Sequence, residues 1–161
     1  MSTVADRPLP PVEHRVRVAL PPDAAFELFT RGIARWWPWR SHSCFGEAAL
    51  DVVFEPRAGG DVVEVSRHGE RAVWGRLSVW DPPRRFAMSW HPGLDVREAT
   101  HLRVEFTALA DGGTEVLVHH GDWEARGAAA AEKRRQYDGG WPVTLAAFAA
   151  CAGPPRGARA P

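Results

Sequence analysis

Hydrophobic and polar residues alternate over most of the chain between residues 13 and 120, which is the period of strands with one buried face. Residues 100–108 are the clearest case, because Leu102, Val104 and Phe106 fall on one side. Turn sequences such as Asp111-Gly-Gly113 separate the segments. The pattern predicts seven strands, at residues 13–20, 49–55, 61–66, 71–80, 85–91, 100–108 and 114–120.

A helical period appears near the C-terminus. One apolar stripe there consists of Trp141, Leu145, Phe148 and Cys151. Gly139-Gly140 ahead of it is interpreted as a flexible entry, and Pro142 suits a first helical turn, which can spare a backbone N–H. The pattern predicts a last helix that starts at this point, ends near Cys151 and packs against an extensive apolar surface.

Further helices are expected elsewhere. Pro21-Pro22-Asp23 stops the first strand, and Asp23 is the predicted cap of a helix over residues 24–29. Residues 33–37 predict a second short helix, followed by a loop at residues 38–46. Residues 124–136 predict a polar helix, either separate from the last helix or continuous with it.

This order of elements predicts an α+β fold, in which a curved seven-stranded antiparallel sheet grips the long C-terminal helix. The chain has 161 residues, enough for one domain with a real core, which we place at residues 13–152. The proline-rich residues 1–12 predict a disordered lead-in, and residues 153–161 a flexible tail.

Composition narrows the functional classes. Twenty basic and twenty acidic side chains cancel, so charge gives no reason to expect nucleic acid or an anionic membrane as a partner. The chain has no long apolar run, and Cys44 and Cys151 suit a reducing compartment, so a soluble cytoplasmic protein is expected. Eight tryptophans against one tyrosine predict that several indoles line a core or a pocket.

A family resemblance rests on seven motifs, which are Phe29-Thr-x-Gly-Ile-x-x-Trp-Trp-Pro38, His42-Ser43, Glu55-Pro-Arg-x-Gly-Gly60, Trp74-Gly-Arg76, Trp80-x-Pro-Pro-Arg-Arg85, Ser89-Trp-His91 and Gly140-Trp-Pro142. The resemblance covers roughly residues 13–152, which is most of the chain. On them the chain resembles a bacterial, stand-alone member of the START-like (SRPBCC, helix-grip) superfamily, in its heat-shock-protein ATPase activator-like branch. The resemblance implies a cavity with an apolar ligand. One departure is His120-Gly-Asp-Trp123, where similar proteins tend to have His-x-Gly-Trp.

Metal and cofactor sites are not expected. His119 and His120 are neighbours on a strand and point to opposite faces, so they cannot share one ion. His42 with Cys44 lacks the second pair of ligands that structural zinc needs.

For catalysis, the candidate proton-transfer groups are His120, His42 and His91, with an acid such as Asp122 or Glu124. The favoured alternative is that these histidines lie at strand ends and bond loop backbone. Cys44 has no sequence neighbour that would lower the pKa of its thiol.

Aromatic residues supply the predicted ligand site. The predicted ligand-binding residues are Trp37, Trp39, Phe45, Met88, Trp90, His120 and Trp141. Phe86, Met88 and Trp90 should share the concave face of one strand. The faces of Trp74 and Arg76 depend on whether a bulge lies near Gly75.

Three functions follow from these observations. The first is a protein that binds an apolar or aromatic small molecule between the sheet and the last helix. The second is an enzyme of cyclase or hydrolase type that uses the same cavity. The third, a co-chaperone of a heat-shock ATPase, rests on the resemblance alone.

Overall fold

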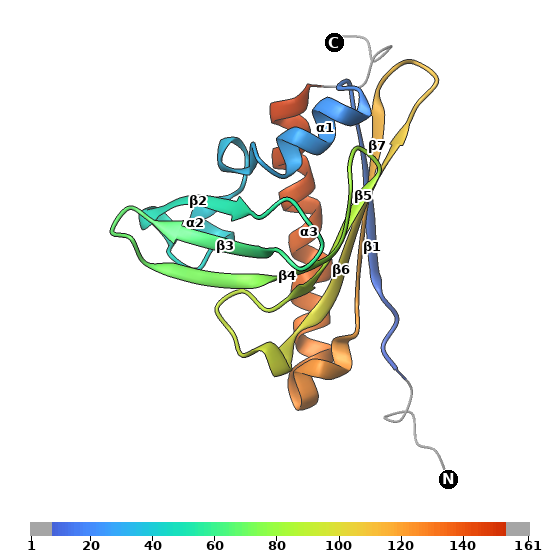
Figure 1. Cartoon of the computed structure of the whole chain (residues 1–161). Coiled ribbons are helices and arrows are strands. Elements are labelled where there is room, and N and C mark those ends of the chain that lie inside the picture. Colours follow the sequence, from blue (N-terminus) through green and yellow to red (C-terminus); the bar gives the residue numbers. More distant parts are fainter. Residues whose placement is uncertain (1–7, 154–161) are drawn as a thin grey trace.

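A single antiparallel sheet organises the protein (Figure 1). The computed structural model describes residues 8–153, so residues 1–7 of the predicted lead-in and 154–161 of the predicted tail lie outside the described part. The sheet has seven strands in the order β1-β7-β6-β5-β4-β3-β2. Their bounds are β1 Val12–Val18, β2 Ala49–Phe54, β3 Asp61–Ser66, β4 Arg71–Asp81, β5 Arg85–Trp90, β6 Thr100–Ala108 and β7 Thr114–Gly121. All seven predicted strands are present and the α+β helix-grip class is confirmed.

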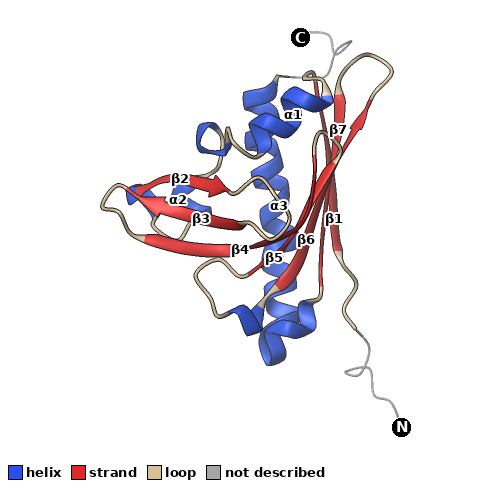
Figure 2. Cartoon of the chain, in the orientation of Figure 1, coloured by secondary structure: helices blue, strands red, loops and turns tan. Residues whose placement is uncertain are grey.

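The sheet is curved around one long helix, α3 (Ala130–Ala152), which crosses its concave side (Figure 2). Alternation along β6 and β7 turns one set of apolar side chains toward the concave face of the sheet. Val104 and Val118 form one such cross-strand pair, and both are buried. Helix α3 meets the sheet through Trp141, whose ring centroid lies 5.7 Å from that of Trp90 on β5. Further along α3, Phe148 contacts Phe29 of α1 and Trp36, with ring centroids 5.2 and 5.0 Å apart. An aromatic core therefore fills one end of the grip.

A bulge in β4 settles the orientation of Trp74. Val62 pairs with Gly75 and Val63 with Val73, which leaves Trp74 without a partner on β3. As a result Trp74 is buried, whereas Arg76 is exposed and faces Asp61, 3.4 Å from Arg76 Nε to Asp61 Oδ1.

The helices before β2 differ from the sequence expectation in detail. They are α1 (Pro22–Phe29), η2 (Ile33–Arg35), α2 (Trp39–His42) and η3 (Gly46–Ala48). Asp23 is not the cap of α1, because the helix begins at Pro22 and Pro21 is the cap residue. The proline fixes φ at a value that suits the helix start, and Asp23 instead accepts the N–H of Ala24. The predicted loop at 38–46 contains α2.

The predicted start of the last helix was wrong. Helix α3 begins at Ala130 and runs through Gly139, Gly140 and Pro142. Gly and Pro cost about 1 and 3 kcal/mol inside a helix, but strong helix formers on the N-terminal side and packing against the sheet outweigh them. Gly127, at φ 57° and ψ −130°, kinks the chain within the preceding segment η5 (Trp123–Ala129), and α3 begins three residues later. Residues 130–136 are thus continuous with the last helix.

Candidate functional site

One pocket opens between α3, α2 with the loop after it, and the ends of β4 and β5. Its volume is about 450 Å³, within the range of small-molecule sites. The lining residues are Trp37, Ser41, His42, Ser43, Cys44, Trp74, Trp90, Pro92, Leu94, Arg126, Lys133, Gln136, Tyr137, Gly140, Trp141 and Thr144.

Four tryptophans in the pocket lining form a closed circuit, in which each indole packs against the next. Successive ring centroids are 5.0 Å apart for Trp37 and Trp74, and 5.2 Å for Trp74 and Trp90. The circuit is completed by Trp141, at 5.7 Å from Trp90 and 6.3 Å from Trp37. These residues come from four separate elements, and each is nearly buried. We call them the tryptophan ring; it forms an aromatic floor.

Every indole N–H of the tryptophan ring has a protein acceptor. Trp37 donates to the carbonyl of His42 at 2.8 Å, and Trp74 to the carboxylate of Glu64 at 2.9 Å. The other two N–H groups are described with Tyr137 and His120 below. These bonds hold each ring plane in place, because a buried indole N–H is costly to leave unpaired.

His120 is a buried partner of the ring and does not line the pocket. Trp141 Nε1 donates to His120 Nδ1 at 3.0 Å, and His120 Nε2 lies 2.7 Å from the hydroxyl of Thr100. That hydroxyl donates to the carbonyl of Trp90 at 3.1 Å. An indole N–H can only donate, so Nδ1 accepts and Nε2 carries the proton.

The protonation state of His120 follows from its burial and its hydrogen bonds. Burial, with the positive charge of Arg126 as the next cause, lowers the pKa of His120 to about 3. The imidazole is therefore neutral, and its lone pair is occupied by Trp141. In this conformation His120 cannot take a proton from a ligand, so its geometry is that of a structural connector.

The other two candidate histidines differ from each other. His91 is buried and its Nδ1 donates to the carbonyl of Leu94 at 3.1 Å, as expected for a strand-end residue that bonds loop backbone. His42 lines the pocket, and its Nδ1 is 2.5 Å from the hydroxyl of Ser41. Burial lowers the pKa of His42. His42 Nε2 lies near Gly140, where an added Cβ would be 3.3 Å away.

Besides His120, three other predicted ligand-binding residues lie away from the pocket lining. Met88 is buried on β5, and Phe45 is half-buried in the turn before η3. Trp39 donates its N–H to the carbonyl of Ala34 at 3.2 Å and faces a separate shallow hollow beside Arg67.

Tyr137 is a pocket residue that the sequence argument did not single out. Its hydroxyl accepts the indole N–H of Trp90 at 3.0 Å, and its ring packs on His120 with centroids 4.8 Å apart. Accepting that bond leaves the hydroxyl proton of Tyr137 free to donate into the pocket. The signal was its position four residues before Trp141, hence one turn away on the same helix face.

Glu64 is a second buried residue that was missed. Its carboxylate is fully buried and accepts the N–H groups of Cys44 and Phe45, each at 2.9 Å, in addition to Trp74. It thereby fixes the loop that forms one pocket wall. Burial, followed by the negative charge of Glu64, raises the pKa of Cys44 to about 11, so the thiol is a poor nucleophile.

Within residues 8–153, no three His, Cys, Asp or Glu side chains gather as a metal site would require. None of the described helices is long and apolar enough to cross a membrane.

Comparison with solved structures places this site in context. An anthrahydroquino-γ-pyrone synthase, Txn09, solved in complex with SUM, is 35% identical, with a TM-score of 0.62 over 88% of this chain and 96% of that chain. The self-sacrificing resistance protein CalC from Micromonospora echinospora is 24% identical, with a TM-score of 0.61 over 89% of this chain and 94% of that chain. The Aha1 dimer from Colwellia psychrerythraea is 14% identical, with a TM-score of 0.63 over 92% and 100%. The last two show likeness of fold alone.

Family assignment comes from the sequence itself. No curated protein matches the chain. The family model described as "Activator of Hsp90 ATPase homolog 1-like protein" matches residues 19–153, which include α1 to α3 and the whole pocket. The START-like branch that the motifs indicated is thereby confirmed, and the chain belongs to the Activator of Hsp90 ATPase homolog 1-like family.

Proposed function

We propose that this protein binds a planar aromatic small molecule in the pocket above the tryptophan ring. The observation that supports the proposal is the ring itself, because four indoles from four elements face one space of about 450 Å³. Aromatic walls with a few polar groups are typical of small-molecule sites. The synthase that is 35% identical bears the name of a fused-ring product, which agrees with an aromatic ligand.

Intrinsic fluorescence tests this proposal. A ligand that stacks on the indoles should quench or shift their emission in a saturable way when a panel of hydroxyanthraquinones is titrated. Trp37→Phe and Trp90→Phe should weaken binding several-fold. Trp80→Phe is the matched control, because Trp80 packs against Phe26 and Phe86 and does not line the pocket. Absence of any saturable change across the panel would refute the proposal.

A second candidate is an enzyme that closes a ring on a ligand held in this pocket. The identity to a synthase supports it, as does His42, which lines the pocket with a pKa lowered by burial. A neutral imidazole at neutral pH is suited to accept a proton. Mass spectrometry of incubated ligands should then detect conversion that is lost in His42→Ala and retained in His91→Ala. A co-chaperone role has the family name as its only basis and is not proposed.

A further inference from the structure

Arg126 is a buried cation without an acidic partner. The side chain lies in the pocket wall with 8% of its surface exposed. Its Nε donates to the carbonyl of Glu98 at 2.7 Å, and Nη2 to the carbonyl of Trp90 at 3.3 Å. Among residues 8–153, no carboxylate forms an ion pair with it, and Nη1 donates to no acceptor. Nη1 is not among the fully buried side-chain atoms that lack a partner, so this donor remains open to the pocket that Arg126 lines.

The backbone holds Arg126 in this place. Segment η5 is a 3₁₀ helix, in which residues three apart lie on the same side, so Trp123 and Arg126 both face inward. Trp123 is fully buried, stacks on His120 at 4.3 Å and donates to its carbonyl at 3.1 Å. Gly127 then turns the chain with a φ of 57° that other residues rarely adopt. The guanidinium thus sits on a fixed support.

The charged side chains that line the pocket are all positive. Its lining includes the cationic residues Arg126 and Lys133 and contains no Asp or Glu among the described residues. Glu98 turns its backbone carbonyl to Arg126. Glu64 does not line the pocket, and its oxygens accept the N–H groups of Trp74, Cys44 and Phe45. An anionic ligand atom would therefore meet a complementary charge in a partly desolvated site.

Together with the proposed function, on which it rests, this arrangement leads to a ligand class. We infer that the aromatic ligand carries an acidic oxygen, as an ionised phenol, enol or carboxylic acid, and that Arg126 binds this oxygen while the rings lie over the tryptophan ring. Nη1 is the donor available for the oxygen. Lys133, which lies on α3 one turn before Tyr137, adds a second positive charge to the pocket lining.

A matched pair of ligands tests the inference in the unmodified protein. Anthraquinone-2-carboxylate and anthraquinone-2-carboxamide share the same rings and differ in charge. The wild-type protein should bind the carboxylate about tenfold or more tightly, as expected for a charge-assisted bond in a buried site. Fluorescence titration at neutral pH gives both dissociation constants. Equal affinities would overturn the role of Arg126 and leave the proposed function standing, whereas failure of both compounds to bind would overturn both.

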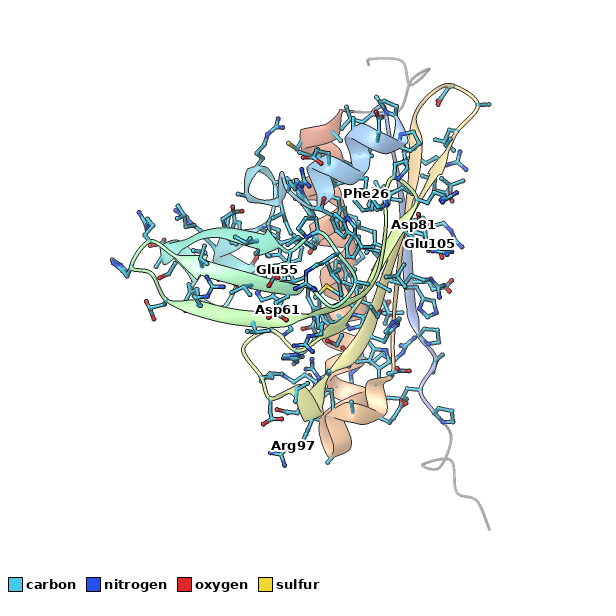
Figure 3. All side chains as sticks on the ribbon, viewed as in Figure 1. Phe26, Glu55, Asp61, Asp81, Arg97 and Glu105 are labelled. Carbon is cyan, nitrogen blue, oxygen red and sulfur yellow. The ribbon has the colours of Figure 1, made fainter. Side chains whose placement is uncertain are left out.

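Variants assign the preference to the residue. Arg126→Met keeps an unbranched side chain but removes the guanidinium, so it should abolish the preference, and Arg126→Lys should retain part of it. Arg97→Met is the matched control, because Arg97 points away from the protein (Figure 3) and pairs with Asp95. Thermal melts establish that each variant is folded. A preference that survives in folded Arg126→Met would contradict the inference.

Discussion

Acidification should destabilise this protein through one buried side chain, His120. The folded protein holds the imidazole neutral with a pKa of about 3, whereas the unfolded chain titrates at the ordinary 6.5. Between these values the unfolded state binds one proton more than the folded state, so the free energy of unfolding falls as pH falls. The stability is fully present above pH 6.5 and is lost progressively below it.

The magnitude follows from the two pKa values. Between pH 7 and pH 5 the unfolded imidazole goes from mostly neutral to mostly protonated, while the folded one stays neutral. Integrating the difference gives a loss of about 2 kcal/mol. His42, whose pKa is also lowered by burial, contributes with the same sign. The contribution of His120 is therefore best measured as a difference between proteins.

His120→Gln provides that difference. Glutamine can accept from Trp141 and donate to Thr100 but does not titrate, so the variant should lose about 2 kcal/mol less than the wild type between pH 7 and pH 5. Urea unfolding of each protein at pH 7 and at pH 5 measures how much unfolding free energy it loses between the two values. His68→Gln, in the exposed β3–β4 turn, is the control and should keep the wild-type decline. If the unfolding free energy of His120→Gln falls as steeply as that of the wild type, the conclusion that the folded protein holds His120 neutral is wrong.

Other substitutions test the packing and the thiol. Trp141→Ala should cost about 3–5 kcal/mol of unfolding free energy, and a melting temperature within a couple of degrees of the wild type would contradict the organising role of α3. Gly75→Ala should cost about 3 kcal/mol or more, because its Cβ would lie 1.7 Å from the carbonyl oxygen of Ser89, whereas Gly139→Ala, with open space around it, should stabilise the helix by about 1 kcal/mol. Cys44 should react with iodoacetamide at pH 8 far more slowly than free cysteine, since the pKa of its thiol is raised to about 11; a rate like that of free cysteine, located by peptide mapping, would refute this.

The strands and the final helix could be predicted from the sequence because their signals are local. Two-residue alternation in β6 and the stripe through Trp141 and Phe148 each depend on a short segment. The bulge at Trp74 could not be assigned, because it arises from the register with β3, a partner strand whose alignment the sequence does not state. The start of α3 was misplaced because local Gly and Pro signals were given more weight than tertiary packing.

The candidate site was predicted only in its apolar half. Trp37, Trp90 and Trp141 were expected around one space and do line it. Arg126 lay in a stretch whose charges look like an ordinary solvated helix face, and only the fold shows that this one points inward. The role of Tyr137 could not be predicted either, because it depends on contacts with Trp90 and His120, which belong to other elements.

The hydrogen bonding of the tryptophan ring has a consequence for ligand selectivity. Because each indole N–H is already committed to a protein acceptor, the floor offers a ligand only ring faces and edges. A surface of this kind recognises flatness and outline, and it rejects an added hydroxyl or a missing methyl group by no more than about 10- to 200-fold. The floor should therefore accept a series of differently decorated ring systems, and discrimination among them is left to the few polar groups at the rim.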